Sequence, residues 1–314
     1  MRAPARLHLG FVDLGSTATR RYGSLGLAVS GLDAVVEARA APALDIVGPQ
    51  PERLSRLALE IAATAGVPCG VALRVSSMPP AHAGLGSGTL LALAAGTACA
   101  AALGVSCTPR DIAALAGRGG RSGIGIGSFE FGGFLVDGGR GPHTGLPPVL
   151  ARVAFPPDWR VVLVFDERRE GLSGVAERAA FGTLPDMTAA TAGALSRHVL
   201  MGVLPALHEA DFRAFSEHLA AVQHLNGSHF AAAQGGVFSS TPVGNCLQEI
   251  SREFDLPGIG QSSWGPTGFI VTPDAGSAER VAAALMRRAA EGLRCQTVAA
   301  ANTGATRTRV KAPA

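Results

Sequence analysis

The alternation of apolar and polar residues along this chain predicts a mixture of strands and helices. Short runs of branched apolar residues, such as 160–166, are typical of strands, whereas residues 51–65 repeat leucine and isoleucine at helical spacing. Strands are predicted at 5–14, 25–39, 71–76, 129–137, 159–166, 268–272 and 296–300, and helices at 51–65, 90–105, 111–116, 188–208, 211–224, 243–254 and 275–291. Because these elements do not alternate as regular βαβ units, the pattern predicts an α+β protein.

The apolar segment 90–105 and the Gly-rich segment 138–148 are interpreted from their own composition. The run from Leu90 to Val105 is shorter than the ~20 residues that a bilayer requires, and it is rich in alanine and glycine. We therefore expect a buried central helix and no association with a membrane. Thr108 is the predicted N-cap of the following helix, with Pro109 at its first position. Residues 138–148, rich in glycine and proline, predict a loop.

Composition narrows the function. A chain of 314 residues predicts one large or two medium domains, and its net charge of +3 argues against general binding of nucleic acid. Lys311 is the only lysine, so lysine chemistry is excluded from the body of the protein. Anions must therefore be recognised by arginine side chains and backbone N–H groups.

Cysteines and histidines give no metal-binding signature. The five cysteines are scattered without a C-x-x-C pair, and the histidines form no H-E-x-x-H motif. Reduced thiols and the lack of a leader-like N-terminus predict a cytoplasmic protein.

The most informative stretch is the Gly/Ser-rich run from Pro79 to Thr89, which opens directly into the long apolar segment. Glycines allow backbone N–H groups to point inward, and the following helix adds the positive end of its dipole. This pattern predicts a phosphate-binding loop. The alternative, a strand-to-helix turn that binds nothing, is open on these residues alone.

A second segment lies about thirty residues further on. Ser122-Gly123-Ile124, followed by Gly132-Gly133, resembles a run in galactokinase, homoserine kinase, mevalonate kinase and phosphomevalonate kinase, and Pro80 to Thr89 resembles their phosphate loop. The resemblance implies two α+β halves with the active site in the cleft between them, here placed at residues 1–155 and 156–314. Gly125 stands where those kinases carry a catalytic aspartate, so the loop is retained while the phosphoryl-transfer base is absent.

Five blocks in order resemble a family with that same departure, the β-ribofuranosylaminobenzene 5′-phosphate synthases of methanopterin-type cofactor biosynthesis. The blocks are 5–14, 21–28, 117–125, 131–139 and 260–268. The resemblance implies that 4-aminobenzoate or 4-hydroxybenzoate attacks C1 of 5-phosphoribosyl 1-pyrophosphate, with loss of CO2 and pyrophosphate. It also implies Mg2+ carried by the phosphoribosyl substrate, small-molecule partners only, and a homodimer.

Candidate site residues follow from these motifs. Phosphate and substrate binding is predicted for Arg20, Arg21, Gly84, Leu85, Gly86, Ser87, Gly88, Thr89, Arg118, Ser122, Ser262 and Gly265, and catalytic roles for His8, Asp13, Arg121 and Asp137. The competing interpretations are solvated surface arginines, a core histidine bonded to backbone, and an Asp137 that only caps a turn. Asn226 and Gln234 lie where the second half would face the cleft, without a predicted role.

Two other functions stay open at this point. An ATP-dependent small-molecule kinase of the same superfamily would need Glu130 or Asp137 to replace the missing base at Gly125. A sensor that binds a phosphorylated ligand without turnover would keep the loop and need no base.

Overall fold

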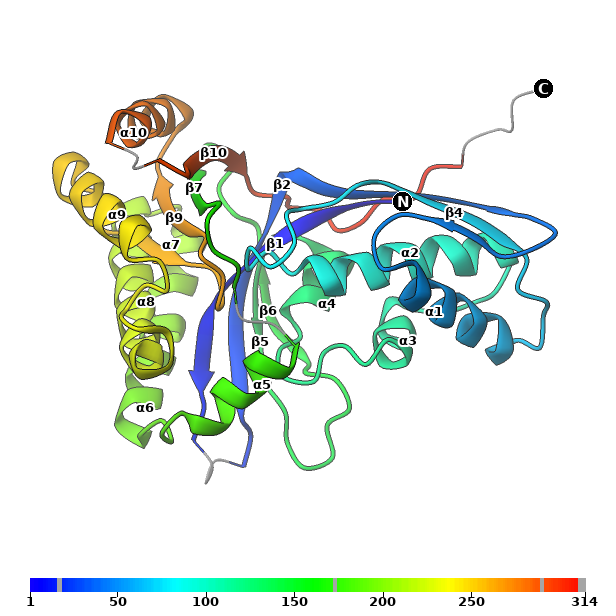
Figure 1. Ribbon diagram of the computed structural model, residues 1–314. Coiled ribbons are helices and arrows are strands. Elements are labelled where there is room, and N and C mark those ends of the chain that lie inside the picture. The colour runs from blue at the N-terminus through cyan, green and yellow to red at the C-terminus, as the bar shows by residue number, and fades with distance from the viewer. Residues whose placement is uncertain (16–18, 172–173, 289–290, 310–314) are drawn as a thin grey trace.

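A computed structural model describes residues 1–15, 19–171, 174–288 and 291–309 of the chain. Its strands form two sheets (Figure 1). The first has the order β3 (Asp45–Val47), β4 (Val71–Ser77), β2 (Tyr22–Ala40), β5 (Phe134–Asp137) and β6 (Val149–Val153), with β1 (Arg2–Asp13) paired to β2. The second has the order β10 (Leu293–Ala299), β7 (Arg160–Asp166), β9 (Gly268–Thr272) and β8 (Ile259–Gln261). Neighbouring strands are antiparallel except for β3 and β4.

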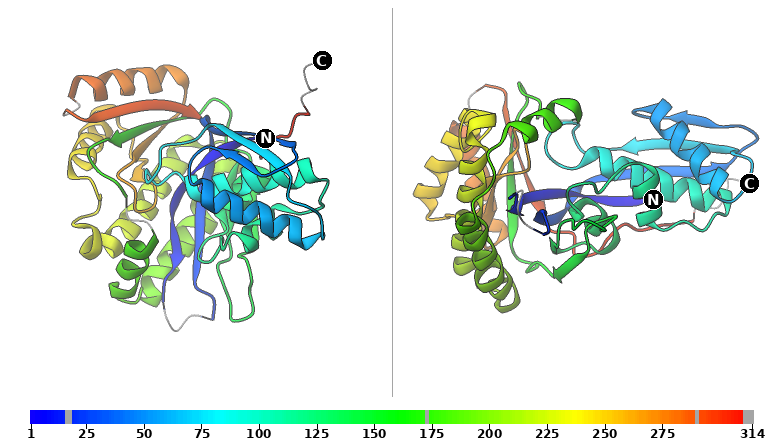
Figure 2. Two further views of the ribbon diagram at one scale, coloured as in Figure 1. Left: turned by 45° about the vertical axis from the view of Figure 1, so that its right-hand side comes forward. Right: turned by 90° about the horizontal axis from the view of Figure 1, so that it is seen from below.

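Helices gather in two groups beside these sheets. The first group is α1 (Pro51–Thr64), α2 (Ser87–Leu103), α3 (Pro109–Leu115) and α4 (Ile124–Phe131). The rest are α5 (Gly174–Thr183), α6 (Ala189–His198), the π-helical turn η1 (Val199–Val203), α7 (Leu204–Glu209), α8 (Phe212–Gln234), α9 (Thr241–Phe254) and α10 (Ala275–Arg288). The long strands β1 and β2 run between the two groups (Figure 2). Helix α2 is buried over most of its length, as its apolar composition predicts.

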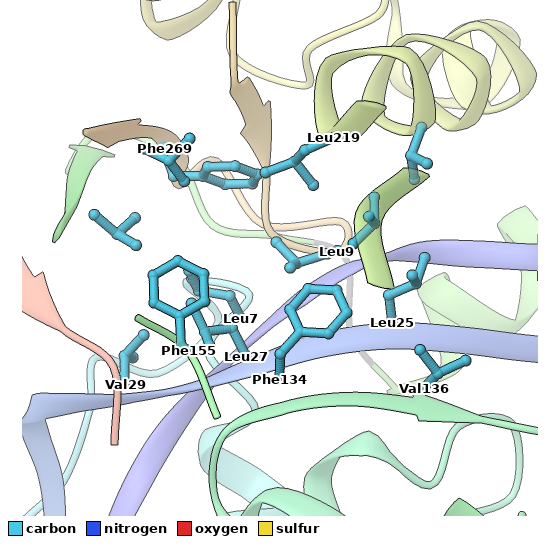
Figure 3. Close-up of a cluster of buried hydrophobic side chains, with 14 of the residues drawn as sticks. Leu7, Leu9, Leu25, Leu27, Val29, Phe134, Val136, Phe155, Leu219 and Phe269 are labelled. Atoms are coloured by element: carbon cyan, nitrogen blue, oxygen red, sulfur yellow. The ribbon is translucent and has the colours of Figure 1, made fainter. Parts of the chain in front are cut away.

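One hydrophobic core joins the two halves of the chain. Alternating leucines of β1 and β2 share one face of the first sheet with Phe134 of β5, and Phe155, Leu219 of α8 and Phe269 of β9 pack onto that face (Figure 3). The chain also returns to its beginning, because the backbone of Thr306 pairs with that of Arg2. The division at residue 155 stays a prediction, and the core is continuous across it.

Most predicted elements are confirmed, with small shifts at their ends. Thr108 caps α3, and Asp111 completes a capping box by accepting a hydrogen bond from the Thr108 backbone N–H. The predicted helix at 188–208 is divided into α6, η1 and α7. Lys311 and residues 289–290 of the predicted last helix lie outside the described residues.

The strand predicted at 129–137 is wrong in its first half. Residues Ile124–Phe131 form α4, and the strand begins only at Phe134. Gly132 and Gly133, with φ of +64° and +79°, turn the chain sharply between the two elements. An apolar run without clear periodicity does not distinguish a buried helix from a buried strand, and here the glycine pair marks the boundary.

Helix α8 is longer than predicted, since it continues from residue 224 to Gln234. The sequence around Asn226-Gly227 is typical of a loop. Within the helix, however, the Asn226 side chain accepts from the Phe11 backbone N–H of β1 and donates to its carbonyl, and Gly227 packs against Val237, so tertiary contacts outweigh local preference. The strands β3, β6 and β8 and the helix α5 were not predicted.

Two further features concern the chain as a whole. The described helices are all too short or too polar to cross a bilayer. The five cysteines are free thiols, and none is paired with another.

Candidate active site

The Gly-rich loop lies between the two halves and is fixed from both sides. The Gly84 carbonyl accepts one hydrogen bond from Arg6 Nη1 of β1 at 2.7 Å and another from Ser262 Oγ at 2.8 Å. A Cβ on Gly84 would lie 2.1 Å from the Ser262 carbonyl oxygen, and one on Gly265 would lie 2.5 Å from the Ala83 carbonyl carbon. Only glycine therefore permits this close approach between residues 83–86 and 262–265.

Two helices begin at this loop without a side-chain cap. Gly86, with φ of +73°, precedes α2, and Gly123 precedes α4. Thr89 in the first turn of α2 faces Gly125 in the first turn of α4, because a Cβ on Gly125 would lie 3.1 Å from Thr89 Cγ2. At the start of α4 the backbone N–H groups of Gly123 and Ile124 donate to Asp137 and to Ser122 Oγ. In α2, by contrast, the N–H groups of Ser87 and Gly88 have no acceptor within the described residues and are available to an anion.

Two arginines lie over the loop, and a third is paired with Glu177, whose charge acts on both of them. The Arg6 guanidinium lies over Gly86, where a Cβ would meet Nε at 2.9 Å, and Arg118 lies over Gly88, where a Cβ would meet Nη2 at 3.1 Å. Arg121 Nη2 pairs with Glu177 of α5 at 3.1 Å, and its guanidinium covers the Phe181 ring at 4.3 Å. We call Arg6, Arg118 and Arg121 the arginine cluster.

The arginine cluster keeps an excess of positive charge. Burial lowers the pKa of both Arg6 and Arg118 to about 10, and the nearby charge of Glu177 opposes this lowering. Both side chains therefore stay charged at neutral pH. Their Nε atoms are shielded from solvent and have no hydrogen-bond partner in the structure. Two charged guanidinium groups over the loop favour the binding of an anion there.

His8 lies next to this cluster as a neutral imidazole. Burial, followed by the charges of Arg6 and Arg121, lowers its pKa well below the usual 6.5. Its Nδ1 accepts from the Gly10 backbone N–H at 3.4 Å, which leaves the proton on Nε2. Nε2 is buried and has no partner. His8 thus offers one unused N–H donor beside the arginines.

We expect the stability of the protein to fall as pH drops below about 6.5, where the unfolded chain takes up a proton on His8 that the folded protein does not. His8→Gln keeps a side-chain N–H and removes this titration. Chemical denaturation of both proteins at pH 7.5, 6.5 and 5.5 measures the effect. The loss of unfolding free energy on acidification should be smaller in the variant. An equal loss in both proteins would show that His8 titrates normally in the fold.

The Asp137 carboxylate is held by hydrogen bonds from the protein itself. Its carboxylate accepts from Ser24 Oγ at 2.5 Å, Gly123 N at 2.9 Å, Ser122 Oγ at 3.2 Å and Gly139 N at 2.8 Å. Burial raises its pKa, although these hydrogen bonds act in the opposite direction. Asp137 therefore positions the start of α4 and holds Ser122, and this geometry does not support the catalytic role predicted for it.

Asp13, Arg20 and Arg21 lie apart from the loop. Asp13 is five residues beyond His8 on β1, ~16 Å away at the usual rise of a strand. Its Oδ1 accepts from Gly15 N at 2.8 Å. Arg20 donates to the carbonyls of Gly138 and Gly139, and Arg21 to that of Leu14. These three residues form a second polar group at the end of the β1–β2 hairpin.

The remaining predicted residues either lie in the loop or hold it in place. Leu85 is buried in the core, and Ser262 joins the loop to β1, because its Oγ also accepts from the His8 backbone N–H at 3.0 Å. Sequence reasoning missed Arg6, Glu177, Phe181 and Trp264. Arg6 lies in the N-terminal block, two residues before His8, but a single arginine on a strand does not by itself indicate a site. Glu177 and Phe181 lie in α5, which gave no clear sequence pattern.

Known proteins resemble this chain over most of its length. Residues 52–133 match the family of GHMP kinases N terminal domains. The chain is 33% identical over 297 residues to beta-ribofuranosylphenol 5′-phosphate synthase of Archaeoglobus fulgidus, covering 89% of this chain and 90% of that protein. It is 31% identical over 296 residues to the protein of that name from Methanothermobacter thermautotrophicus, covering 87% and 88%.

Solved structures support the fold independently. Phosphomevalonate kinase of Streptococcus pneumoniae superimposes with a TM-score of 0.71 at 12% identity, covering 96% of this chain and 98% of that chain. Homoserine kinase from Cytophaga hutchinsonii gives 0.65 at 18% identity, covering 96% and 94%. The α+β fold of the GHMP superfamily, expected from the loop motifs, is confirmed. By its sequence likeness over nearly its whole length, the chain belongs to the β-ribofuranosylphenol 5′-phosphate synthase family, enzymes of the pentosyltransferase type within the GHMP superfamily.

Proposed function

We propose that this enzyme joins C1 of 5-phosphoribosyl 1-pyrophosphate to the ring of 4-hydroxybenzoate or 4-aminobenzoate, with release of CO2 and pyrophosphate, in tetrahydromethanopterin biosynthesis. The observation that carries the proposal is the arginine cluster over an uncapped Gly-rich loop, with Gly125 in place of a kinase base. The relatives named above are synthases of a ribofuranosylphenol 5′-phosphate, which supports this class of reaction.

The reaction balances without an oxidant. The ring carbon that bears the carboxylate forms a bond to C1 of the ribose, and the bond from C1 to pyrophosphate breaks with its electron pair going to the leaving group. The bond from ring to carboxylate then breaks, its electrons restore the aromatic ring, and CO2 leaves uncharged. The protein must therefore stabilise the departing pyrophosphate and position the ring carbon behind C1.

In this proposal the loop and the arginine cluster bind the pyrophosphate. Backbone N–H groups in the first turn of α2, such as those of Ser87 and Gly88, donate to it, and Arg6 and Arg118 contribute positive charge. These donors are fixed before the substrate binds, so little reorganisation is needed as negative charge grows on the leaving group. His8 and Arg121 lie at the edge of the same site, on the side that faces the second substrate.

Mg2+ bound to the phosphates would neutralise part of the developing charge. The hydroxyls of Ser87 and Thr89 and the carboxylate of Glu177 are oxygen donors suited to it. The described residues contain no group of three His, Cys, Asp or Glu side chains that could hold a metal. The donor set therefore fits an ion that arrives on the substrate. A homodimer and a cytoplasmic location stay predictions.

We expect Arg121→Lys to lower kcat/KM for the phosphoribosyl substrate three- to tenfold. Lysine keeps the charge but loses the planar group that pairs with Glu177 and covers Phe181. Steady-state kinetics at a fixed Mg2+ concentration measures the change. Arg213→Lys is the matched control, because Arg213 forms exposed ion pairs with Glu217 and Asp255 away from the loop. Wild-type kinetics in Arg121→Lys would remove Arg121 from the site.

One assay separates the proposed function from the two alternatives. The protein is incubated with Mg2+, the aromatic acid and either 5-phosphoribosyl 1-pyrophosphate or ATP, and pyrophosphate and ADP are both measured. The proposal predicts pyrophosphate only from the phosphoribosyl substrate and only when the acid is present. ADP formation would favour a kinase. Tight binding of the phosphoribosyl substrate without any turnover would favour a sensor.

A further inference from the structure

We propose that a cavity of about 240 Å3 beside the Gly-rich loop binds the aromatic acid. This inference rests on the proposed function and assigns the second substrate to named residues. The cavity lies between α8, the middle of β1 and residues 259–264, and we call it the aromatic cavity. His8 lines it, and its backbone N–H donates to Ser262 Oγ, which donates in turn to the Gly84 carbonyl of the loop, so the cavity adjoins the phosphate site at this residue.

Its size suits a single aromatic ring. An apolar cavity of ~150 Å3 is sufficient for benzene. A volume of about 240 Å3 leaves room for one carboxyl group and one small para substituent, but not for a nucleotide. The aromatic cavity therefore fits a benzoate rather than the adenosine part of ATP.

Aromatic side chains form much of its wall. The ring centroids of Phe230 and Trp264 are 4.7 Å apart, and those of Phe11 and Phe230 are 6.2 Å apart. Phe181 of α5, which Arg121 covers, contacts Phe11, Phe230 and Trp264 edge-on. Rings in these tilted and edge-on arrangements present both faces and edges to a further ring.

A bulge in β1 opens the cavity, and the side chains of α8 hold that bulge in place. The pairing of β1 with β2 shifts between His8 and Phe11, around Gly10 with φ of +115°. Asn226 accepts from the Phe11 backbone N–H at 2.8 Å and donates to its carbonyl at 3.1 Å. Gln223 donates to the Leu9 carbonyl at 2.7 Å. These amides satisfy the backbone that the bulge leaves unpaired, which fixes the shape of the cavity before any ligand binds.

Two residues that line the cavity each carry a buried N–H donor without a partner. Nε2 of His8 and Nε1 of Trp264 are both shielded from solvent without a hydrogen bond in the structure. An unsatisfied buried donor is costly and usually marks a ligand or an ordered water. Both side chains line the aromatic cavity, which contains no Arg, Lys, Asp or Glu among its described lining residues.

An uncharged lining suits an acid that must lose its carboxylate as neutral CO2. An arginine salt bridge would stabilise the carboxylate and so oppose its loss, whereas neutral N–H donors orient the group with less stabilisation. We therefore place the carboxylate within reach of His8 Nε2 and Trp264 Nε1, which also brings the reacting ring carbon to the phosphate site.

The test compares two leucine substitutions on the same helix. Ala220 lines the aromatic cavity, whereas Ala232 is exposed on α8 and does not. Ring-labelled 4-hydroxybenzoate and 4-aminobenzoate are titrated by equilibrium dialysis with saturating pyrophosphate, and the KM of both substrates is measured. Ala220→Leu should weaken acid binding tenfold or more and leave the KM for 5-phosphoribosyl 1-pyrophosphate within twofold. Ala232→Leu should change neither.

Trp264→Phe provides a second, independent variant, because it keeps an aromatic ring and removes the N–H together with part of the indole. It should raise the KM for the acid at least threefold without a matching change for the phosphoribosyl substrate. Wild-type acid affinity in folded Ala220→Leu, or unchanged acid KM in Trp264→Phe, would overturn the assignment of the cavity while the synthase reaction stands. Failure of the wild-type protein to turn over either acid would instead overturn the proposed function.

Discussion

Gly86→Val is expected to lower kcat/KM for 5-phosphoribosyl 1-pyrophosphate by a hundredfold or more. Gly86 precedes α2 with φ of +73°, and a Cβ there would lie 2.9 Å from Arg6 Nε. Valine would therefore displace a guanidinium of the arginine cluster and block close approach of phosphate to the backbone. Loss of one preorganised donor costs ~3 kcal/mol, or about two orders of magnitude in rate. Steady-state kinetics and direct binding of the substrate measure the effect.

Gly104→Val is the matched control. Gly104 ends the same helix with φ of +70°, and nothing lies within 4 Å of its Cβ position. Both substitutions force a branched residue into the left-handed region, at a cost of ~1–2 kcal/mol in stability. Only Gly86→Val should impair substrate binding. Near wild-type activity in folded Gly86→Val would remove the loop from the site, and equal losses in both variants would assign the effect to stability.

Gly125→Asp is expected to reduce synthase activity tenfold or more. Gly125 lies in the first turn of α4 against Thr89, so its new carboxylate would face the phosphate site. Two unit charges about 4 Å apart repel by ~4 kcal/mol at an effective dielectric constant of ~20. If Mg2+ or protonation relieves two thirds of this, the remainder is still about a factor of ten. Initial rates of pyrophosphate release measure the loss.

Gly125→Asn and Gly125→Ala separate charge from size. Each places a Cβ 3.1 Å from Thr89 Cγ2, so each requires the same small adjustment of its neighbour. The asparagine variant should retain more activity than the aspartate variant. Equal activities would mean that charge at this position has no effect. If instead Gly125→Asp gains phosphoryl transfer from ATP, the protein is closer to a kinase than we propose.

The sequence predicted those parts of the fold that depend on local pattern. The Gly-rich loop, the buried α2 and the cap at Thr108 each have a short signature that tertiary contacts only reinforce. Residues 124–131 lacked one, because an apolar run with two glycines allows either a helix or a strand. The continuation of α8 through Asn226 depends on a hydrogen-bonded bulge in β1, more than two hundred residues away in the chain.

Only the part of the site that carries a sequence motif could be predicted from the sequence. Glycines that permit close approach and arginines beside them are visible as sequence patterns, and the structure places Arg118 over Gly88 of the loop. Arg6 was not selected, since one arginine on a strand carries no signal until Gly86 is placed beneath it. Asp137 has the position typical of a functional carboxylate, yet its four hydrogen-bond donors are visible only in three dimensions.

The central claim is that pyrophosphate departure and decarboxylation are parts of one reaction. The most direct test supplies wild-type protein with 5-phosphoribosyl 1-pyrophosphate, Mg2+ and a carboxyl-labelled 4-hydroxybenzoate or 4-aminobenzoate, and counts labelled CO2 against pyrophosphate. Our account predicts equal amounts of the two products, and neither when one substrate is omitted. Pyrophosphate release without labelled CO2, or labelled CO2 that does not depend on the phosphoribosyl substrate, would contradict it.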